Sequence, residues 1–397
     1  METKKRLVLY LSSQASSKGH LFLSSLHHML LIVLFACLLV SCGKQPAVSS
    51  VEMTIGVETN ASIEEFIEEV TLVPLETNDE CLLGELEKIQ KVGGRLYISD
   101  QRKAAVFVFD KSGKYLYKIE RRGNGPEEYV EVSDFDVKDG VVYVLSNPNK
   151  RILAYDEYGK CVKTIGLNAW YHYLAVEKNR VVLYANRANE QMYNVVIINH
   201  QGELLSQYLP YQKQDSYRRG GCGSPIKRMK DGEYLFTSYF SGKVASMKDG
   251  VCDYKYHFDF DVANKVSEEE METMTYGDIS DRLRWKESLV AIEGMAQDGE
   301  GSILMAASFF FDGRGLRDAL CKVDLKTGTS RFYLLGEKLE EKYPYLSGVV
   351  SMEGNKLYSY TMPFVMYRMH ENIGTPLPEG LNEDDNPVIG IYTLNLD

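Results

Sequence analysis

The chain has 397 residues, of which 44% are hydrophobic and 11% aromatic, so it can bury a large core. Its formal net charge of −11 would repel a phosphate backbone, and we therefore expect no nucleic-acid partner. The histidines are not spaced as metal pairs, so we expect no transition-metal site.

The chain begins with a segment typical of an exported lipoprotein. The apolar run at 29–40 is short for a permanent membrane anchor and, after a basic start, predicts a signal peptide over 1–41. The run at 39–43, LVSCG, resembles a bacterial lipobox, so we expect Cys42 to be lipidated. The small, polar residues of 42–62 then predict a tether. An ordinary signal peptide that happens to contain a cysteine is the alternative.

A tight hairpin recurs along the rest of the chain and predicts the fold. Each copy places a Gly- or Asn-containing turn between short apolar strands, which is the strongest short-range hairpin signal. The copies lie at 91–97, 137–143, 176–182, 229–235, 296–303 and 351–358. A second hairpin follows each of the first five copies. The turns of this second hairpin lie at 109–114, 155–160, 199–203, 247–250 and 324–329.

Two hairpins in series make one four-stranded antiparallel sheet, and six such sheets predict an all-β, six-bladed β-propeller over 63–397. The last unit stops at its third strand, 388–396. We expect 70–75 to supply the missing fourth strand, because such a closure removes the open edge of the ring. A capping box at 267–270 predicts a small helical insertion over about 259–288.

The long segments between the predicted strands all fall on one face. First-to-second and third-to-fourth turns are short and share a face, here called the short-turn face. Second-to-third turns and blade crossings lie on the opposite, loop-rich face. The long segments of this second set are 120–133, 210–224, 259–288, 307–318 and 362–387. Since binding and catalytic residues favour loops on a rigid scaffold, we expect the site on the loop-rich face.

A polar cluster in the first crossing is one candidate site. Its members are Arg121, Arg122, Glu127, Glu128 and Tyr129. An arginine fork suits a carboxylate or another anion. The alternative is a crossing whose charges brace neighbouring blades.

Aromatic residues of the predicted loops are the second candidate set. Exposed rings stack on sugar rings or grip peptides, whereas rings that alternate inward pack in the core. The members of this set are Trp170, Trp285, Phe311 and the nearby cation Arg314.

Oxygen-bearing side chains that follow the second strands of several blades are the third candidate set. These residues are Asp100, Asn147, Asn186 and Asp312. Carboxylate and amide oxygens are the ligands that calcium prefers, so these residues are an alternative calcium site at the channel mouth. Polar turn residues are also common at such positions for structural reasons.

The crossing at 119–129, IERRGNGPEEY, resembles the NHL-type repeat of six-bladed propellers, and the whole chain resembles a family of six-bladed propeller lipoproteins common in Bacteroidota. The resemblance implies the fold, export and a lipid anchor in the outer membrane, and it carries no catalytic residues over. The absence of an acidic stretch after Cys42 favours the periplasmic side.

We therefore expect a lipid-anchored envelope protein that binds a protein or glycan on its loop-rich face, without a cofactor and more as a binder than as an enzyme. A calcium-dependent hydrolase or lyase similar to gluconolactonases is the alternative. A structural subunit of an envelope complex is the third possibility.

Overall fold

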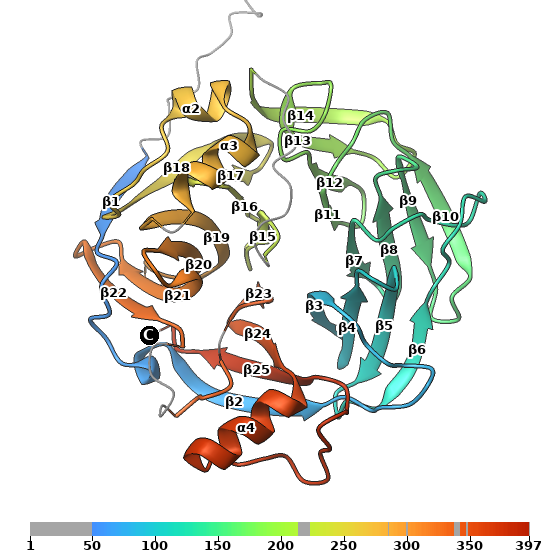
Figure 1. Ribbon diagram of the computed structural model, residues 1–397. Helices are drawn as coiled ribbons and strands as arrows, with labels where there is room; N and C mark the ends of the chain where they lie inside the picture. The colour runs from blue at the N-terminus through green and yellow to red at the C-terminus, as the bar shows by residue number, and fades with distance from the viewer. Residues whose placement is uncertain are drawn as a thin grey trace, which may run out of the picture. The chain divides into compact units, whose positions relative to one another are not determined.

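The structure is a computed structural model that describes residues 50–212, 223–284, 286–298, 301–336, 342–346 and 348–396. These residues belong to one compact unit, Ser49–Asp397. Within this unit, six sheets, each with four antiparallel strands, are arranged as blades of a ring (Figure 1). The predicted six-bladed β-propeller is confirmed.

Each of the first three blades consists of four consecutive strands, from the innermost to the outermost. Blade 1 contains β3 (Leu86–Val92), β4 (Arg95–Asp100), β5 (Ala105–Asp110) and β6 (Tyr115–Ile119). Blade 2 contains β7 (Asp134–Lys138), β8 (Val141–Ser146), β9 (Arg151–Tyr155) and β10 (Cys161–Gly166). Blade 3 contains β11 (Tyr173–Val176), β12 (Val181–Tyr184), β13 (Tyr193–Ile198) and β14 (Leu204–Pro210).

The remaining blades follow the same order along the chain. Blade 4 contains β15 (Ile226–Arg228), β16 (Tyr234–Ser238), β17 (Ser241–Lys248) and β18 (Val251–Phe260). Blade 5 contains β19 (Ser288–Gln297), β20 (Ser302–Phe311), β21 (Gly315–Asp324) and β22 (Thr329–Leu334). Blade 6 contains β23 (Ser351–Glu353), β24 (Lys356–Thr361), β25 (Val388–Leu394) and, from the other end of the chain, β2 (Ile67–Pro74).

The strand β2 closes the ring, as the sequence predicts. It pairs antiparallel with β25, with Val70 opposite Tyr392 and Leu72 opposite Gly390. Because β2 is the edge strand of its sheet, the proline that ends it removes no bond from the interior of the sheet.

The segment before β2 differs from the prediction. The strand β1 (Val51–Ile55) extends blade 4 as a fifth strand, parallel to β18. The side chain of Ile55 is fully buried, and the backbone N–H of Asn60 donates to the carbonyl oxygen of Phe332 at 3.1 Å. The predicted tether over 42–62 is therefore wrong from residue 51 onward, because alternating apolar side chains of this segment pack on blades 4 and 5. Cys42 and the predicted signal peptide lie outside the described residues.

The core lies between the blades. Among the described residues, six of the apolar clusters lie between blades, one for each pair of neighbouring blades around the ring. Between blades 1 and 2, for example, Val106 and Val108 of β5 pack with Phe135 of β7 and Val144 of β8. Each blade therefore buries both of its faces only in the presence of its neighbours.

The predicted insertion is partly helical. It contains α2 (Glu268–Thr273) and α3 (Tyr276–Leu283), and Ser267 caps α2 by accepting a bond from the Glu270 backbone N–H at 3.2 Å. The other helices of the described residues are the 3-10 turn η1 (Ile63–Glu65) and α4 (Pro363–Ile373), which lies beside blade 6. None of the described helices has the length and apolar character needed to span a bilayer.

The segment 307–318 is a second difference from the prediction. It forms the end of a long hairpin, in which β20 and β21 pair as far as Phe311 opposite Gly315. The expected loop is therefore only the short turn at 312–314, because the apolar alternation continues the strands through the segment.

Candidate ligand-binding channel

The innermost strands of all six blades line one cavity at the centre of the ring. These strands are β3, β7, β11, β15, β19 and β23, and the cavity has a volume of about 100 Å³. Charged side chains from five of the six strands reach it. They are Glu87, Lys88, Asp134, Asp136, Lys227, Arg228, Glu293 and Glu353.

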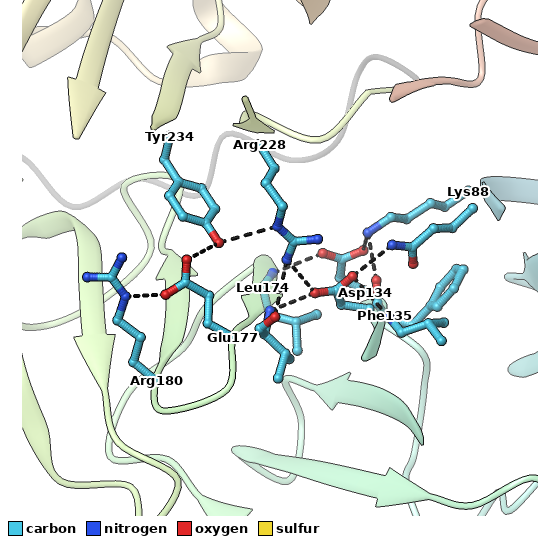
Figure 2. Close-up of polar contacts among 12 residues, drawn as sticks. Lys88, Asp134, Phe135, Leu174, Glu177, Arg180, Arg228 and Tyr234 are labelled. Carbon is cyan, nitrogen blue, oxygen red and sulfur yellow. Dashed lines mark hydrogen bonds and ion pairs between the residues drawn. The ribbon is translucent and has the colours of Figure 1, made fainter. Parts of the chain in front are cut away.

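Lys88 and Asp134 form the first ion pair of the channel. The Lys88 Nζ lies 2.9 Å from Asp134 Oδ1 and also donates to the Phe135 carbonyl oxygen at 2.6 Å (Figure 2). The other oxygen of Asp134 accepts the backbone N–H of Leu174 at 2.9 Å. The Asp134 side chain is fully buried, so this carboxylate ties β3, β7 and β11 together.

Asp136 is the most heavily bonded group of the channel. Its Oδ1 accepts Gln90 Nε2 at 2.9 Å and the Val137 N–H at 3.0 Å. Its Oδ2 accepts the Val176 N–H at 2.6 Å and Arg228 Nη2 at 2.9 Å. Four inner strands, β3, β7, β11 and β15, therefore meet at one carboxylate that is 3% exposed.

Arg228 connects Asp136 to the rim of the channel. Its Nε donates to the Tyr234 hydroxyl at 3.3 Å, and this hydroxyl donates to Glu177 Oε1 at 2.8 Å. The other oxygen of Glu177 pairs with Arg180 (Figure 2). The chain of contacts fixes the Arg228 guanidinium although its side chain is 36% exposed.

The polar side chains around Arg228 lie at the short-turn end of the channel. Arg228 and Glu353 are the last residues of β15 and β23, directly before the first-to-second turns of their blades. Glu177 and Arg180 lie in the corresponding turn of blade 3. An open cleft of about 500 Å³ lies against the same turn and shares Arg228 with the channel.

Glu353 faces Asp136, Arg228 and Lys88 across the channel. Desolvation of the carboxyl and then the negative charge of Asp136 raise the pKa of Glu353 above its usual 4.5, although the residue as a whole is exposed to solvent, which weakens the shift. The protonated form of this carboxyl is therefore favoured to a higher pH than in a solvated glutamate.

The opposite wall carries a buried proton-sharing group. The Ser308 hydroxyl oxygen lies 2.8 Å from Glu293 Oε1 and 2.7 Å from Asp318 Oδ1. Because one hydroxyl has one hydrogen, one of the two carboxyls carries a proton and donates to the serine. Burial raises the pKa of both acids and lowers the pKa of Lys227, whose Nζ donates to the Glu293 carbonyl oxygen at 2.7 Å.

The polar cluster predicted in the first crossing lies elsewhere. Arg121 donates to the carbonyl oxygen of Gly159 at 3.2 and 3.1 Å, and Tyr129 is fully buried. Glu128 accepts a backbone N–H of its own crossing at 2.9 Å. The exposed members are Arg121, Arg122 and Glu127. These contacts attach the crossing to blade 2. Anion binding by the residues of this crossing stays a prediction.

The predicted aromatic set does not gather at one place. Phe311 is 8% exposed and packs 5.9 Å from the ring of Phe309 in the core between blades 4 and 5, so it is no surface anchor. Trp170 is 45% exposed, in the crossing between blades 2 and 3, and Arg314 is exposed in the β20–β21 turn. Trp285 lies outside the described residues.

The residues of the alternative calcium site are not among those that line the channel. Asp100 accepts hydrogen bonds from the backbone N–H groups of Gly84 and Lys103. Asn147 accepts one from the Tyr171 N–H at 3.0 Å. Both side chains therefore stabilise the backbone of nearby loops. Asn186 is buried, and Asp312 is exposed in a turn. Within the described ranges, no group of three or more His, Cys, Asp or Glu residues is placed to hold a metal ion.

The channel residues were not among the predicted site residues. One signal for them exists in the sequence: polar residues at every second position of an inner strand, as Lys88 and Gln90 in β3 or Asp134 and Asp136 in β7. This spacing places both side chains of a strand on the same face of its sheet.

Comparisons with known proteins identify the family. No curated protein sequence matches the chain. The fold is similar to the crystal structure of a putative exported protein from Bacteroides fragilis NCTC 9343, with a TM-score of 0.67, 14% identity, and coverage of 87% of this chain and 99% of that one. A member of the DUF4221 family from Bacteroides vulgatus ATCC 8482 is similar with a TM-score of 0.53, 12% identity, and coverage of 83% and 98%. These identities show the fold alone.

A family model, Domain of unknown function (DUF4934), matches residues 47–393, which include β1 and all six blades. The chain therefore belongs to the DUF4934 family.

Proposed function

We propose that this protein is a lipid-anchored binding protein of the cell envelope that holds a small polar ligand in its central channel. The observation that carries the proposal is the convergence of charged side chains from five inner strands on one cavity. Buried charges are costly to a fold unless they are paired, and a concave site with a few convergent polar groups is the usual form of a ligand site.

The channel supports this function better than the loop-rich face does. Arg121, Glu128 and Tyr129 are engaged in contacts of the crossing, and Phe311 is buried. Arg228, in contrast, is fixed by Asp136 and Tyr234 and still exposes about a third of its side chain. A fixed, partly exposed guanidinium is a preorganised hydrogen-bond donor.

The envelope location rests on the sequence before the propeller. The lipobox-like run at 39–43 supports lipidation of Cys42, which would attach the protein to a membrane. The Cys42→Ala variant should then move from the membrane fraction to the soluble fraction of the cell. If the variant and the parent protein partition equally, the lipid anchor is refuted.

The binding function is tested by a thermal-shift screen of small envelope-derived glycans and peptides. Any ligand of the folded state raises the melting temperature. We expect the shift to be lost in Arg228→Ala and kept in Arg122→Ala, a matched control on the exposed part of the first crossing. A ligand whose shift survives Arg228→Ala and is lost in Arg122→Ala or Trp170→Ala would place the site on the loop-rich face instead.

A further inference from the structure

We infer that the open cleft at the short-turn end of the channel binds a phosphate group. The cleft has a volume of about 500 Å³, and residues of three consecutive blades line it, from the end of β7, the β11–β12 turn and the end of β15. Of these residues, only Arg228 also lines the central channel, so the site goes beyond the proposed function.

The charged residues that line the cleft leave an excess of positive charge. They are four cations, Lys138, Lys178, Arg180 and Arg228, and one carboxylate, Glu177. Their formal charges add to +3, in a chain whose formal net charge is −11. A local excess of this kind in an acidic protein favours an anionic ligand.

The carboxyl groups around the cleft do not remove this excess. Asp136 pairs with Arg228 from the channel side and lowers the sum to +2. Asp139, in the β7–β8 turn, and Glu353, on the channel wall, are not among the residues that line the cleft. Asp231 of the neighbouring turn is paired with Lys248. An anion in the cleft therefore meets more cations than carboxylates.

The two arginines are held in place while part of each guanidinium stays available. Arg180 pairs through Nε with one oxygen of Glu177, and the Tyr234 hydroxyl donates to the other oxygen at 2.8 Å (Figure 2). Arg228 donates through Nε to the same hydroxyl at 3.3 Å. Arg180 Nη1 and Nη2 and Arg228 Nη1 have no hydrogen-bond partner among the described residues. Guanidinium groups fixed in this way are preorganised donors to phosphate oxygens.

The two lysines add positive charge that no carboxylate balances. Lys138 ends β7 at the second position after Asp136, so both side chains lie on the same face of the strand. Lys178 is exposed in the β11–β12 turn. Neither lysine has an ion-pair or hydrogen-bond partner among the described residues. A lysine ammonium binds phosphate as a point charge and needs no fixed geometry.

Donors on several sides of the cleft suit a phosphate better than a carboxylate. A carboxylate has two oxygens in one plane, and a single arginine fork satisfies it. A phosphate group presents at least three acceptor oxygens that point in different directions. In this cleft the cations come from three blades, so they can approach such a group from several sides.

Titration calorimetry of the purified protein with small soluble probes tests the inference. Glycerol 3-phosphate carries the phosphate group, acetate carries a carboxylate, and glycerol is the neutral control. We expect glycerol 3-phosphate to bind roughly tenfold or more tightly than acetate, because it can use more of the available donors. Acetate or glycerol binding as tightly as glycerol 3-phosphate, or no binding of glycerol 3-phosphate, overturns the inference.

Replacement of the two lysines tests the place of binding. Lys138→Met and Lys178→Met each remove one charge without leaving a carboxylate unpaired. Each should weaken glycerol 3-phosphate by about twofold to fivefold, and the double variant should weaken it by about tenfold. Lys111→Met removes the same charge from the exposed β5–β6 turn on the same face and should bind like the parent protein. If the double variant and Lys111→Met bind alike, the inference is overturned.

Arg180→Lys tests the contribution of the guanidinium. The variant keeps a cation beside Glu177 but loses the two terminal nitrogens of the arginine. We expect glycerol 3-phosphate to bind roughly tenfold more weakly, while the melting temperature without ligand stays close to that of the parent protein. Unchanged affinity in this variant would contradict the role given to Arg180.

A further probe distinguishes the source of the phosphate. Glycerophosphoglycerol, the deacylated headgroup of phosphatidylglycerol, is a phosphodiester, whereas glycerol 3-phosphate is a monoester. Tighter binding of the diester supports the site with a lipid headgroup, and tighter binding of the monoester supports it with a soluble phosphate ester. The channel function is decided separately by the thermal-shift screen, because Lys138 and Lys178 do not line the channel.

Discussion

Replacement of Asp136 by alanine should destabilise the propeller more than most single substitutions. The change leaves the Val176 N–H and Gln90 Nε2 without their acceptor, and both residues are at least nine-tenths buried. Each buried, unpaired donor costs about 1–3 kcal/mol. Arg228 can turn to water because it is 36% exposed, so its share is smaller. We therefore expect a loss of about 3–5 kcal/mol, as for other broken buried pairs.

A loss of about 4 kcal/mol is large enough to measure by calorimetry. At an unfolding entropy of about 2.1 cal/mol/K per residue, it lowers the melting temperature of a unit of this size by about 5 °C. Asp136→Asn keeps the shape and half of the acceptors, so its melting temperature should lie between those of Asp136→Ala and the parent protein. Asp231→Ala, which breaks an exposed pair with Lys248, is the control and should change the melting temperature by no more than about 1 °C. If Asp136→Ala melts within about 1 °C of the parent protein, Asp136 does not hold the four strands together.

Three further substitutions test other parts of the structure. Glu293→Gln should flatten the pH dependence of the melting temperature. Burial raises the pKa of Glu293 above 4.5 in the folded protein, so its bound proton stabilises the fold at low pH. This stabilisation is lost as the pH rises from about 5 to about 8, and the glutamine variant lacks it at every pH. Gly113→Ala should melt well below the parent protein, because Gly113 has a φ of +88° and an added Cβ would lie 2.0 Å from the Pro74 carbonyl oxygen. Ile55→Ala should cost about 2–4 kcal/mol in unfolding free energy, because this side chain is fully buried on blades 4 and 5.

Two of these variants have a matched comparison within the chain, and the third is compared with the parent protein. Gly140→Ala also has a positive φ but open space around the added Cβ, so equal melting of Gly140→Ala and Gly113→Ala would refute the clash. Thr54→Ala changes the exposed neighbour of Ile55, and equal effects of the two would mean that β1 does not pack on the propeller. Parallel pH profiles of Glu293→Gln and the parent protein would contradict the raised pKa.

The architecture could be predicted because its signal is local and repeated. A Gly- or Asn-containing turn between apolar strands specifies a hairpin from a few adjacent residues, and the copies reinforce one another. The closing strand β2 was predictable for a different reason, since the last unit had three strands and an apolar segment near the start had no partner. The segment 51–55 was missed because parallel pairing with β18 leaves no turn signal.

The channel could not be predicted because it is assembled from residues far apart in the sequence. Gln90, Asp136 and Arg228 lie in three different blades, and each looks like an ordinary polar residue in a short strand. Their meeting depends on the register of each inner strand and on the curvature of the ring, which no short segment specifies. The long loops of the chain also favoured the loop-rich face, whereas the polar side chains around Arg228 lie at the short-turn end.

The closure by β2 has a consequence for the order in which the chain can fold. β2 is synthesised before any blade, yet its partner β25 is the last strand of the described residues. Until β25 is present, blade 6 is incomplete, and its apolar clusters with blades 5 and 1 cannot form fully. Contacts between such distant segments form slowly because a long loop must first be closed. A chain whose synthesis has not yet reached β25 therefore holds an open arc of blades, and the ring can close only once β25 is present to pair with β2.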